Sequence, residues 1–386
     1  MKLSYAPRLL LLFLALSIVY LALAGVCLFP IGYYGAPGEP SYSDPWIARA
    51  ETILEGGSLY QDVMTSTPPL VNFLLIPPVL VSRLFGHVNP WSTLSFMVYF
   101  GAFNLASAFV LLNTGGDRRE GYRSAVAFLV NPLTMGNAIL RRQDESILVF
   151  FFALGLMYVL HRRQWHAGVA IGLSMLVKLS GALTIPVAFI REQDWRYLVL
   201  PAVIFGLAFA PFLLRAGESA VFWDVSGDNK QHPFQLHGIS FGNLWRHGHD
   251  GQPLISLRLH SVLLVAGSAA ATILIAWRSA GLLEDLTLLT VTGLLLSPKL
   301  HTGYFTLVVL MMAPLVKRYR RAWLAVPAGA LIMLVDVLKS ELDAYSAAFG
   351  LLAGAFLLLI FAIIQFRRDA ALSRAARQST EQGYQS

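Results

Sequence analysis

The sequence predicts an all-α membrane protein: a polytopic transmembrane helical bundle of about 10 full spans plus a re-entrant hairpin, with an external amphipathic helix loop after the first span. Two bulk observations support this class. Hydrophobic residues make up 56% of the 386 residues and charged residues only 13%, whereas a soluble domain carries about 25% charged residues. Apolar runs of membrane-spanning length, about 20 residues, recur along the whole chain.

The predicted spans follow one another with short links. They lie near residues 8–29, 91–113, 124–140, 145–161, 166–190, 197–215, 260–277, 283–298, 302–316, 322–338 and 345–366. A further apolar run, 68–86, contains Pro68, Pro69, Pro77 and Pro78. Because prolines disrupt a regular helix, we expect a short kinked or interfacial segment there. The basic start and the lack of a small-residue cleavage site predict that the first helix is retained.

The Lys and Arg residues predict the orientation. With the N-terminus inside and 30–90 outside, most basic links fall on the cytoplasmic side, as the positive-inside rule requires. The segment 166–190 must then enter and return on one side, as two half-helices around the sequence KLSG. Broken helices at membrane depth are tolerated where they line a protein cavity or a site. Both termini are expected to be cytoplasmic.

The same orientation predicts the domain organisation. We expect a single transmembrane domain over residues 1–386. Its parts are a first external loop with surface helices at 30–90, a second large external loop at 216–259, and a cytoplasmic tail at 367–386. The single cysteine, Cys27, excludes an internal disulfide and a cysteine-based metal site. The net charge of +7 marks the cytoplasmic side of a membrane protein, and we expect no nucleic-acid partner.

The first external loop opens on a helix start. Asp44 and Pro45 fit the N-cap and first helical positions, and Gly56 and Gly57 fit the helix end. Apolar residues then share one helical face: Trp46, Ile47, Ala50, Ile53 and Leu54. We expect a short amphipathic helix on the membrane surface. Asp44 is then either a cap alone or a carboxylate fixed where a catalytic base is needed.

Four stretches give a resemblance to a known family. They are LEGGSLYQD with STPPLVNFLL, NPLTMGNAILRRQDESILVFFF, AGVAIGLSMLVKLSGALTIP, and LLSPKLHTGYFTLVVLMMAP. In this order they resemble the motifs of GT-C superfamily polytopic membrane glycosyltransferases that depend on polyprenyl-phosphate sugars, the mannosyltransferase-like members in particular. Two positions differ from those motifs: Arg142 stands where a Gly is usual, and Gly303 stands where a Gln is frequent.

The resemblance implies roles for the acidic residues. Asp44 would be the catalytic base that deprotonates the acceptor hydroxyl. Asp144 and Glu145 would orient the acceptor or, together, hold a divalent metal, since carboxylate oxygens suit Mg²⁺ or Mn²⁺. A carboxylate pair without further ligands is a weak metal signal, so we expect no metal and no cofactor. The alternative for this pair is an ordinary charged turn between two spans.

The basic residues would bind the donor phosphate. Lys178 lies in the middle of an apolar segment, where a lysine is costly unless it is paired or faces water. We expect Lys178, Lys299, His301, Tyr304 and Arg141 to contact the lipid phosphate. The alternatives are a structural, snorkelling Lys178 and an interfacial polar cluster at 299–304.

The second external loop carries several histidines, with His247 and His249 in an H-x-H pattern, but no third ligand stands at a zinc-site spacing. A flexible loop with Trp223 and Trp245 for sugar stacking is favoured. The sequence also lacks nucleotide-binding and metalloprotease motifs.

The sequence therefore predicts a glycosyltransferase that moves a hexose, with mannose the first candidate, from a polyprenyl-phosphate donor to an acceptor lipid or glycan at the outer or lumenal leaflet. The membrane would be the plasma membrane in a prokaryote or the endoplasmic reticulum in a eukaryote. The alternatives are a transporter or lipid flippase, and a non-catalytic subunit with the same fold.

Overall fold

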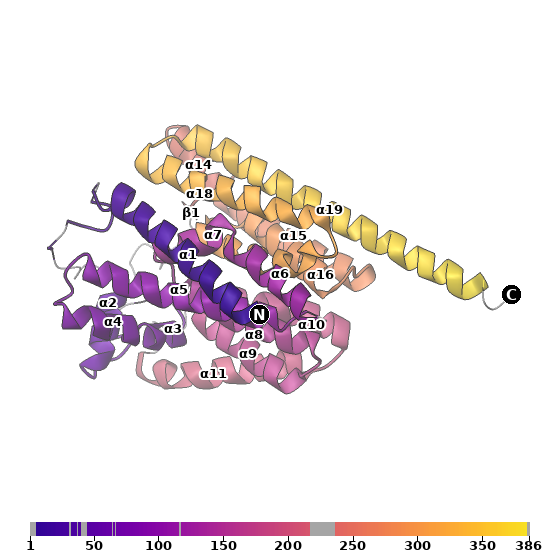
Figure 1. Ribbon diagram of the computed structural model, residues 1–386, viewed down its shortest axis with the longest axis horizontal. Coiled ribbons are helices and arrows are strands. Elements are labelled where there is room, and N and C mark those ends of the chain that lie inside the picture. The colour runs from indigo at the N-terminus through magenta and orange to yellow at the C-terminus, as the bar shows by residue number, and fades with distance from the viewer. Residues whose placement is uncertain are drawn as a thin grey trace. The chain divides into compact units, whose positions relative to one another are not determined.

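The computed structural model of the chain is a helical protein (Figure 1). It describes residues 5–30, 32–36, 38–39, 45–63, 65, 67–115, 117–216 and 236–383. Within these ranges the named strands are β1 (His237–Gly238) and β2 (Lys299–Leu300), which form one two-stranded sheet. The all-α prediction is confirmed.

Helices long and apolar enough to cross a membrane are distributed along the described residues. Six meet this criterion: Tyr5–Leu28, Trp91–Leu112, Arg196–Arg215, Leu257–Trp277, Arg320–Lys339 and Tyr345–Ser373. Shorter apolar helices cover Pro69–Leu84, Glu145–Leu160, Gln164–Val177 and Thr302–Val316. Together they make a polytopic membrane protein, in which several of the predicted spans are built from shorter pieces.

The chain divides into two compact units. Unit 1 comprises residues 1–130, 134–185 and 194–235, and unit 2 comprises residues 131–133, 186–193 and 236–386. The expectation of a single domain stays a prediction.

Unit 1 is built around a long central helix, α5, which packs against α6 and α8. Its elements are α1 (Tyr5–Leu23) with its π-helical extension η1 (Ala24–Leu28), α2 (Pro45–Leu54), α3 (Pro69–Leu74), α4 (Ile76–Leu84), α5 (Trp91–Leu112), α6 (Arg118–Leu129), η2 (Gly136–Leu140), α8 (Glu145–Leu160), α9 (Gln164–Val177), η3 (Leu179–Leu183) and α11 (Arg196–Ala216). Two short helices, α7 (Pro132–Met135) and α10 (Thr184–Glu192), begin in one unit and end in the other.

The predicted span 124–140 is wrong as a continuous helix. The chain forms α6, α7 and η2 in succession. The break falls at Asn131 and Pro132, because proline has no N–H to donate within a helix. The Asn131 side chain takes over part of the bonding: its Oδ1 accepts from the Leu133 N–H at 3.0 Å, and its Nδ2 donates to the Ala325 carbonyl at 2.8 Å.

Helices α9 and α11 pack closely through two glycines. A methyl group placed on Gly168 would lie 2.8 Å from Leu200 Cβ, and one placed on Gly172 would lie 3.0 Å from Ile204 Cβ. Small residues four apart let helix backbones approach in this way. Because the later glycine meets the later partner, α9 and α11 run in the same direction.

Parallel packing of α9 and α11 requires the chain to return to its starting end between them. The return begins at Lys178, where the backbone is extended (φ −152°, ψ 143°) and α9 ends. Trp165 and Trp195, at the starts of the two helices, have ring centroids 6.4 Å apart. The predicted re-entrant path around KLSG is therefore confirmed.

Within the predicted external loop 30–90, the short helix expected from Pro45 onwards is present. Helix α2 begins at Pro45, and Gly56 takes the left-handed conformation (φ +83°) just after its end. Most of its apolar face, however, packs against protein, and only Leu54 at the end of the face is exposed. Ile47 and Ala50 are 2% and 0% exposed, and the Trp46 ring lies 5.4 Å from the Phe96 ring of α5. Helix α2 packs on α3 and α4 and places Trp46 against the aromatic rings of α5, which corrects the predicted membrane contact for this part of the face.

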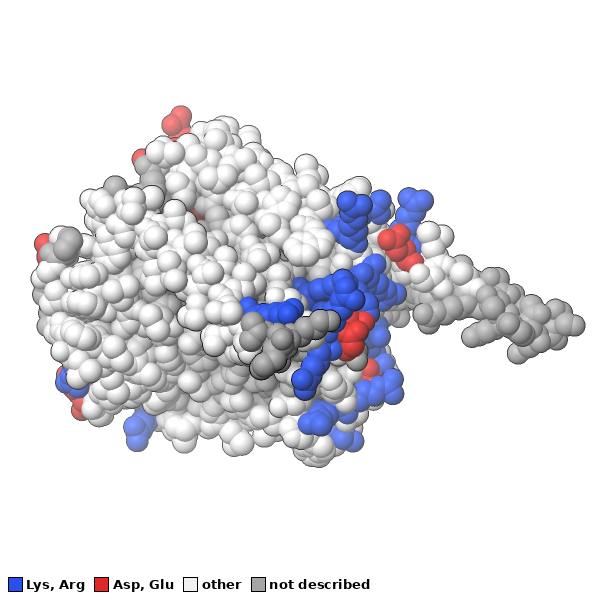
Figure 2. All heavy atoms as spheres, viewed as in Figure 1, with Lys and Arg blue, Asp and Glu red and all other residues white. Residues whose placement is uncertain are grey.

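Unit 2 contains the C-terminal helices. These are α14 (Phe241–Gly248), α15 (Leu257–Trp277), α16 (Leu282–Leu296), η4 (Thr302–Tyr304), α17 (Phe305–Met312), η5 (Ala313–Val316), η6 (Arg320–Leu324), α18 (Ala325–Glu341) and α19 (Tyr345–Gly383). Helix α19 packs against α14, α16 and α18. It continues through most of the predicted tail 367–386 (Figure 1). In Figure 2 the surface of α19 becomes charged where its apolar sequence ends.

Candidate functional site

A helical hairpin brings three of the predicted site residues together. Helices α8 and α9 are joined by a three-residue turn, 161–163, and therefore run antiparallel. A methyl group placed on Gly155 of α8 would lie 3.2 Å from Ile171 Cγ1 of α9, which shows how closely they pack. The first residue of α8, Glu145, thus lies at the same end of the hairpin as Lys178, which follows the last residue of α9.

These residues form a cluster that we call the Lys178 triad: Asp144, Glu145 and Lys178. The Lys178 Nζ lies 2.8 Å from Asp144 Oδ1 and also pairs with Glu145 Oε1. Asp144 occupies the N-cap position of α8 but its side chain makes no capping hydrogen bond. Its carboxylate forms an ion pair with Lys178 instead.

The Lys178 triad is buried. Asp144 and Glu145 are 4% and 1% exposed, and the Lys178 side chain is 16% exposed. Charged groups in such a place are costly unless they are paired, so the pairing explains how Lys178 is accommodated without snorkelling to water. Two carboxylates face one ammonium, and Glu145 Oε2 has no hydrogen-bond partner among the described residues. The cluster is therefore rich in acceptors.

The two arginines before the triad lie against tyrosines of the first loop. The Arg141 guanidinium carbon is 5.6 Å from the centroid of the Tyr33 ring, and that of Arg142 is 5.2 Å from the centroid of the Tyr34 ring. The Tyr34 hydroxyl donates to the Leu140 carbonyl at 2.7 Å. Burial raises the pKa of Tyr34 above its ordinary value, so the hydroxyl remains a donor. The packing of Arg141 and Arg142 on these tyrosine rings was not predicted from the sequence.

A second group of predicted residues lies in unit 2. Strand β2 pairs in parallel with β1, and the Ile239 N–H donates to the Leu300 carbonyl at 2.7 Å. Leu300 is fully buried. Because side chains alternate along a strand, Lys299 and His301 project together to the opposite face. The His301 and Tyr304 rings meet edge to face, 5.6 Å apart.

The remaining predictions have different outcomes. Asp44 and Trp223 lie outside the described residues. Trp245 stacks on His249 at 3.8 Å, and His247 stacks on Tyr345 at 4.9 Å. No group of three or more potential metal ligands occurs in the described part of the chain.

Comparisons with solved structures gave matches that include two states of ArnT. The chain is similar to ArnT from Cupriavidus metallidurans bound to undecaprenyl phosphate, with 15% identity and a TM-score of 0.46 over 92% of this chain and 77% of that chain. The apo state of ArnT from the same organism gives 14% identity and the same TM-score, over 92% of this chain and 76% of that chain. No match was found among curated proteins.

The comparison with family models is more informative. Residues 67–298, more than half of the chain, match the model of glycosyltransferase family 87. The matched range contains the whole Lys178 triad and ends just before Lys299. The chain belongs to glycosyltransferase family 87.

Proposed function

We propose that this protein transfers a hexose, with mannose the first candidate, from a polyprenyl-phosphate donor to an acceptor lipid or glycan at the outer or lumenal leaflet. The observation that carries the proposal is the buried Lys178 triad within the region that matches the glycosyltransferase family. A membrane-embedded, acceptor-rich cluster of this kind suits a polyhydroxylated substrate that arrives on a lipid.

The triad has two proposed duties. Asp144 and Glu145 accept hydrogen bonds from sugar or acceptor hydroxyls, which orients the reacting groups. Lys178 holds both carboxylates in place. Because they offset its charge, Lys178 contributes to phosphate binding as a positioned N–H donor and not as an uncompensated cation. Most of the positive charge for the donor phosphate then falls to Lys299, His301 and Arg141, with Tyr304 as a further hydrogen-bond donor.

In the proposed reaction the acceptor oxygen forms a bond to the anomeric carbon while the bond from that carbon to the phosphate oxygen breaks. Asp44 takes the proton of the acceptor hydroxyl, a role supported by the resemblance to GT-C enzymes. Polyprenyl phosphate leaves as a stable anion, so little acid catalysis is required. Positioning and electrostatic stabilisation supply most of the rate enhancement.

The direct test is sugar transfer by the full-length protein in proteoliposomes. Radiolabelled polyprenyl-phosphate mannose and other polyprenyl-phosphate hexoses are offered with membrane lipid and glycan acceptors. Formation of a glycosylated product supports the proposal. A lipid-linked sugar that crosses the bilayer without product formation would instead support a flippase, for which the broken helix after Lys178 is also suitable.

Replacement of the proposed base sharpens this test. Asp44→Asn should lower turnover by about 10²–10⁴-fold, the usual contribution of a general base. The fold should survive, because Asn is as good an N-cap as Asp. Glu55→Gln, just after the same short helix, is the control and should leave turnover nearly unchanged. Near-normal transfer by the Asn variant would leave Asp44 with a capping role only.

The proposed orientation places both termini in the cytoplasm. In a Cys27→Ala background, a cysteine at Ser41 should react with an impermeant external reagent, and a cysteine at Ser373 should react only after the membrane is opened. External labelling at Ser373 would reverse the orientation. The membrane would be the plasma membrane of a prokaryote or the endoplasmic reticulum of a eukaryote.

A further inference from the structure

Unit 2 contains a cavity of about 520 Å³ that the transfer reaction does not use. It lies between η6, with the two residues before it, and the part of α19 where the apolar sequence becomes polar. The residues that matter for its chemistry are Arg318, Arg320, Arg321, Trp323, Phe361 and Asp369.

The three arginines of this cavity differ in the hydrogen bonds and ion pairs that their side chains form. Arg318 Nη1 pairs with Glu284 Oε1 at 3.1 Å. Arg321 Nη1 donates to Gln365 Oε1 at 2.6 Å. The Arg320 side chain is exposed and makes no hydrogen bond or ion pair within the described ranges. Asp369 offsets one charge, and the cavity retains an excess of positive charge that suits an anion.

The wall of the cavity is aromatic and exposed. Trp323 and Phe361 are 41% and 46% exposed, and the Arg321 guanidinium carbon lies 5.7 Å from the centroid of the Phe361 ring. Exposure of two aromatic side chains to water is unfavourable. Their exposure at the boundary between lipid headgroups and acyl chains is favourable. The anion that fits this cavity therefore carries an apolar part.

The position of the cavity agrees with the headgroup level of a bilayer. Arg320 is the first residue of an apolar segment long enough to span a membrane. On α19 the basic residues Arg367 and Arg368 follow the apolar stretch, and charged side chains appear there on the surface (Figure 2). Both walls thus change from apolar to basic at the cavity.

We propose that this cavity binds the headgroup of an anionic phospholipid of the surrounding bilayer. The lipid phosphate would contact Arg320 and Arg321, and the first acyl carbons would lie along Trp323 and Phe361. Basic pockets at the ends of transmembrane helices are suited to such headgroups. The site is distinct from the residues assigned to the sugar donor, and the inference does not depend on the proposed transfer reaction.

The test is native mass spectrometry of the delipidated full-length protein, titrated with phosphatidylglycerol, phosphatidylcholine or sn-glycerol 3-phosphate. The wild type should retain phosphatidylglycerol at least about tenfold better than phosphatidylcholine. Arg320→Gln should weaken phosphatidylglycerol retention about fivefold, the contribution of one cation near a membrane surface, and Arg320→Gln/Arg321→Gln about 25-fold. Arg118→Gln/Arg119→Gln, a matched pair of exposed arginines at the start of α6, should have no effect.

Trp323→Ala separates a lipid from a soluble anion. It should weaken retention of phosphatidylglycerol and leave the weak binding of sn-glycerol 3-phosphate unchanged. Equal retention of the two phospholipids, or an unchanged affinity in the double arginine variant, would overturn the proposal. Binding of sn-glycerol 3-phosphate as tight as that of phosphatidylglycerol would overturn it in favour of a soluble anion site.

Discussion

Two pairs of adjacent acidic residues begin apolar helices in this protein, and they are neutralised differently. Asp144 and Glu145 precede and begin α8, and Glu284 and Asp285 lie in the first turn of α16. All four are at least 95% buried, with exposed fractions from 0% to 4%. Their surroundings differ in the number of cations that each pair receives.

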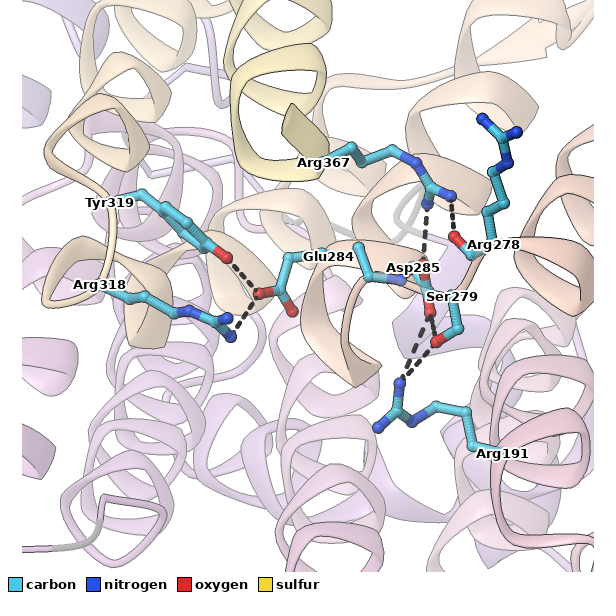
Figure 3. A network of polar contacts seen from close by, with 9 residues as sticks. Arg191, Arg278, Ser279, Glu284, Asp285, Arg318, Tyr319 and Arg367 are labelled. Atoms are coloured by element: carbon cyan, nitrogen blue, oxygen red, sulfur yellow. Dashed lines mark hydrogen bonds and ion pairs between the residues drawn. The ribbon is translucent and has the colours of Figure 1, made fainter. Parts of the chain in front are cut away.

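Both carboxylates of the pair on α16 form ion pairs with arginine side chains (Figure 3). Glu284 Oε1 accepts from Arg318 Nη1 at 3.1 Å and from the Tyr319 hydroxyl at 2.9 Å. Asp285 Oδ1 accepts from Arg367 Nη1 at 2.8 Å. A further arginine, from α10, lies 3.7 Å from the other Asp285 oxygen. Each carboxylate thus has its own cation, as expected of a network that fixes helices to one another.

The pair on α8 shares one cation. Lys178 serves both Asp144 and Glu145, and one oxygen of Glu145 has no partner among the described residues. A buried cluster with incomplete neutralisation costs stability, and such clusters concentrate at functional sites. The comparison teaches that the number of carboxylates does not distinguish the two pairs, whereas the ratio of cations to carboxylates does. We therefore propose a functional role for the α8 pair and a structural role for the α16 pair.

Removal of the shared cation should produce the largest effect. Lys178→Met would leave two buried carboxylates with no counter-charge between them, and loss of one partner from a buried ion pair costs about 3–5 kcal/mol. We expect a strong loss of thermal stability in detergent, together with loss of transfer. The measurement is unfolding of the purified variant followed by a transfer assay on the folded fraction.

A rescue variant separates the two losses. In Lys178→Met/Asp144→Asn/Glu145→Gln the buried charges are removed together, so most of the stability should return while transfer stays low. Recovery of transfer along with stability would show that the triad only holds the hairpin together, and the α8 pair would then resemble the α16 pair.

A matched pair of single substitutions should give the next largest effect. Glu145→Gln keeps the size of the side chain but weakens its hydrogen-bond acceptance, and misplacement of substrate by such a change costs about 10²-fold in turnover. Glu284→Gln, an equally buried glutamate on α16, should change turnover per folded molecule by less than about threefold, because its partners Arg318 and Tyr319 are not shared with the Lys178 triad and residues without shared partners act nearly independently. Equal losses in the two variants would remove the functional distinction between the pairs.

Part of this arrangement was predictable from the sequence. The proline-rich run 68–86 and the segment around KLSG were expected to be broken, and α3, α4 and the end of α9 confirm it. The pairing of Lys178 with Asp144 and Glu145 was not predicted. It follows from length: a helix of 16 residues, a short turn and a helix of 14 residues bring the two ends of the hairpin level.

Three other structural features could not be predicted, because the sequence carries no pattern that distinguishes them. The parallel pair β1 and β2 has two residues in each strand, too few for an alternating pattern to be recognised. The buried face of α2 has the same amphipathic spacing as a face that lies on lipid. Arg142, at a position where the related motifs usually have Gly, adopts φ +50°. Glycine adopts this left-handed conformation without strain, which explains why it suits the position. The conformation cannot be recognised from a sequence that has arginine there.

The smallest effect is expected from the exposed end of the α16 network. The Arg318 side chain is 52% exposed, whereas its partner Glu284 is 3% exposed. Solvent screens an ion pair with such an exposed member, which limits its contribution to about 0–1 kcal/mol. In Arg318→Met the Tyr319 hydroxyl still donates to Glu284, so the carboxylate keeps a partner. The variant should therefore unfold within a few degrees of the wild type and transfer sugar at a normal rate, as measured by the same unfolding and transfer assays. A loss as large as that of Lys178→Met would mean that the Tyr319 hydroxyl cannot replace Arg318, and that Glu284 depends on its single cation as strongly as the pair on α8 depends on Lys178.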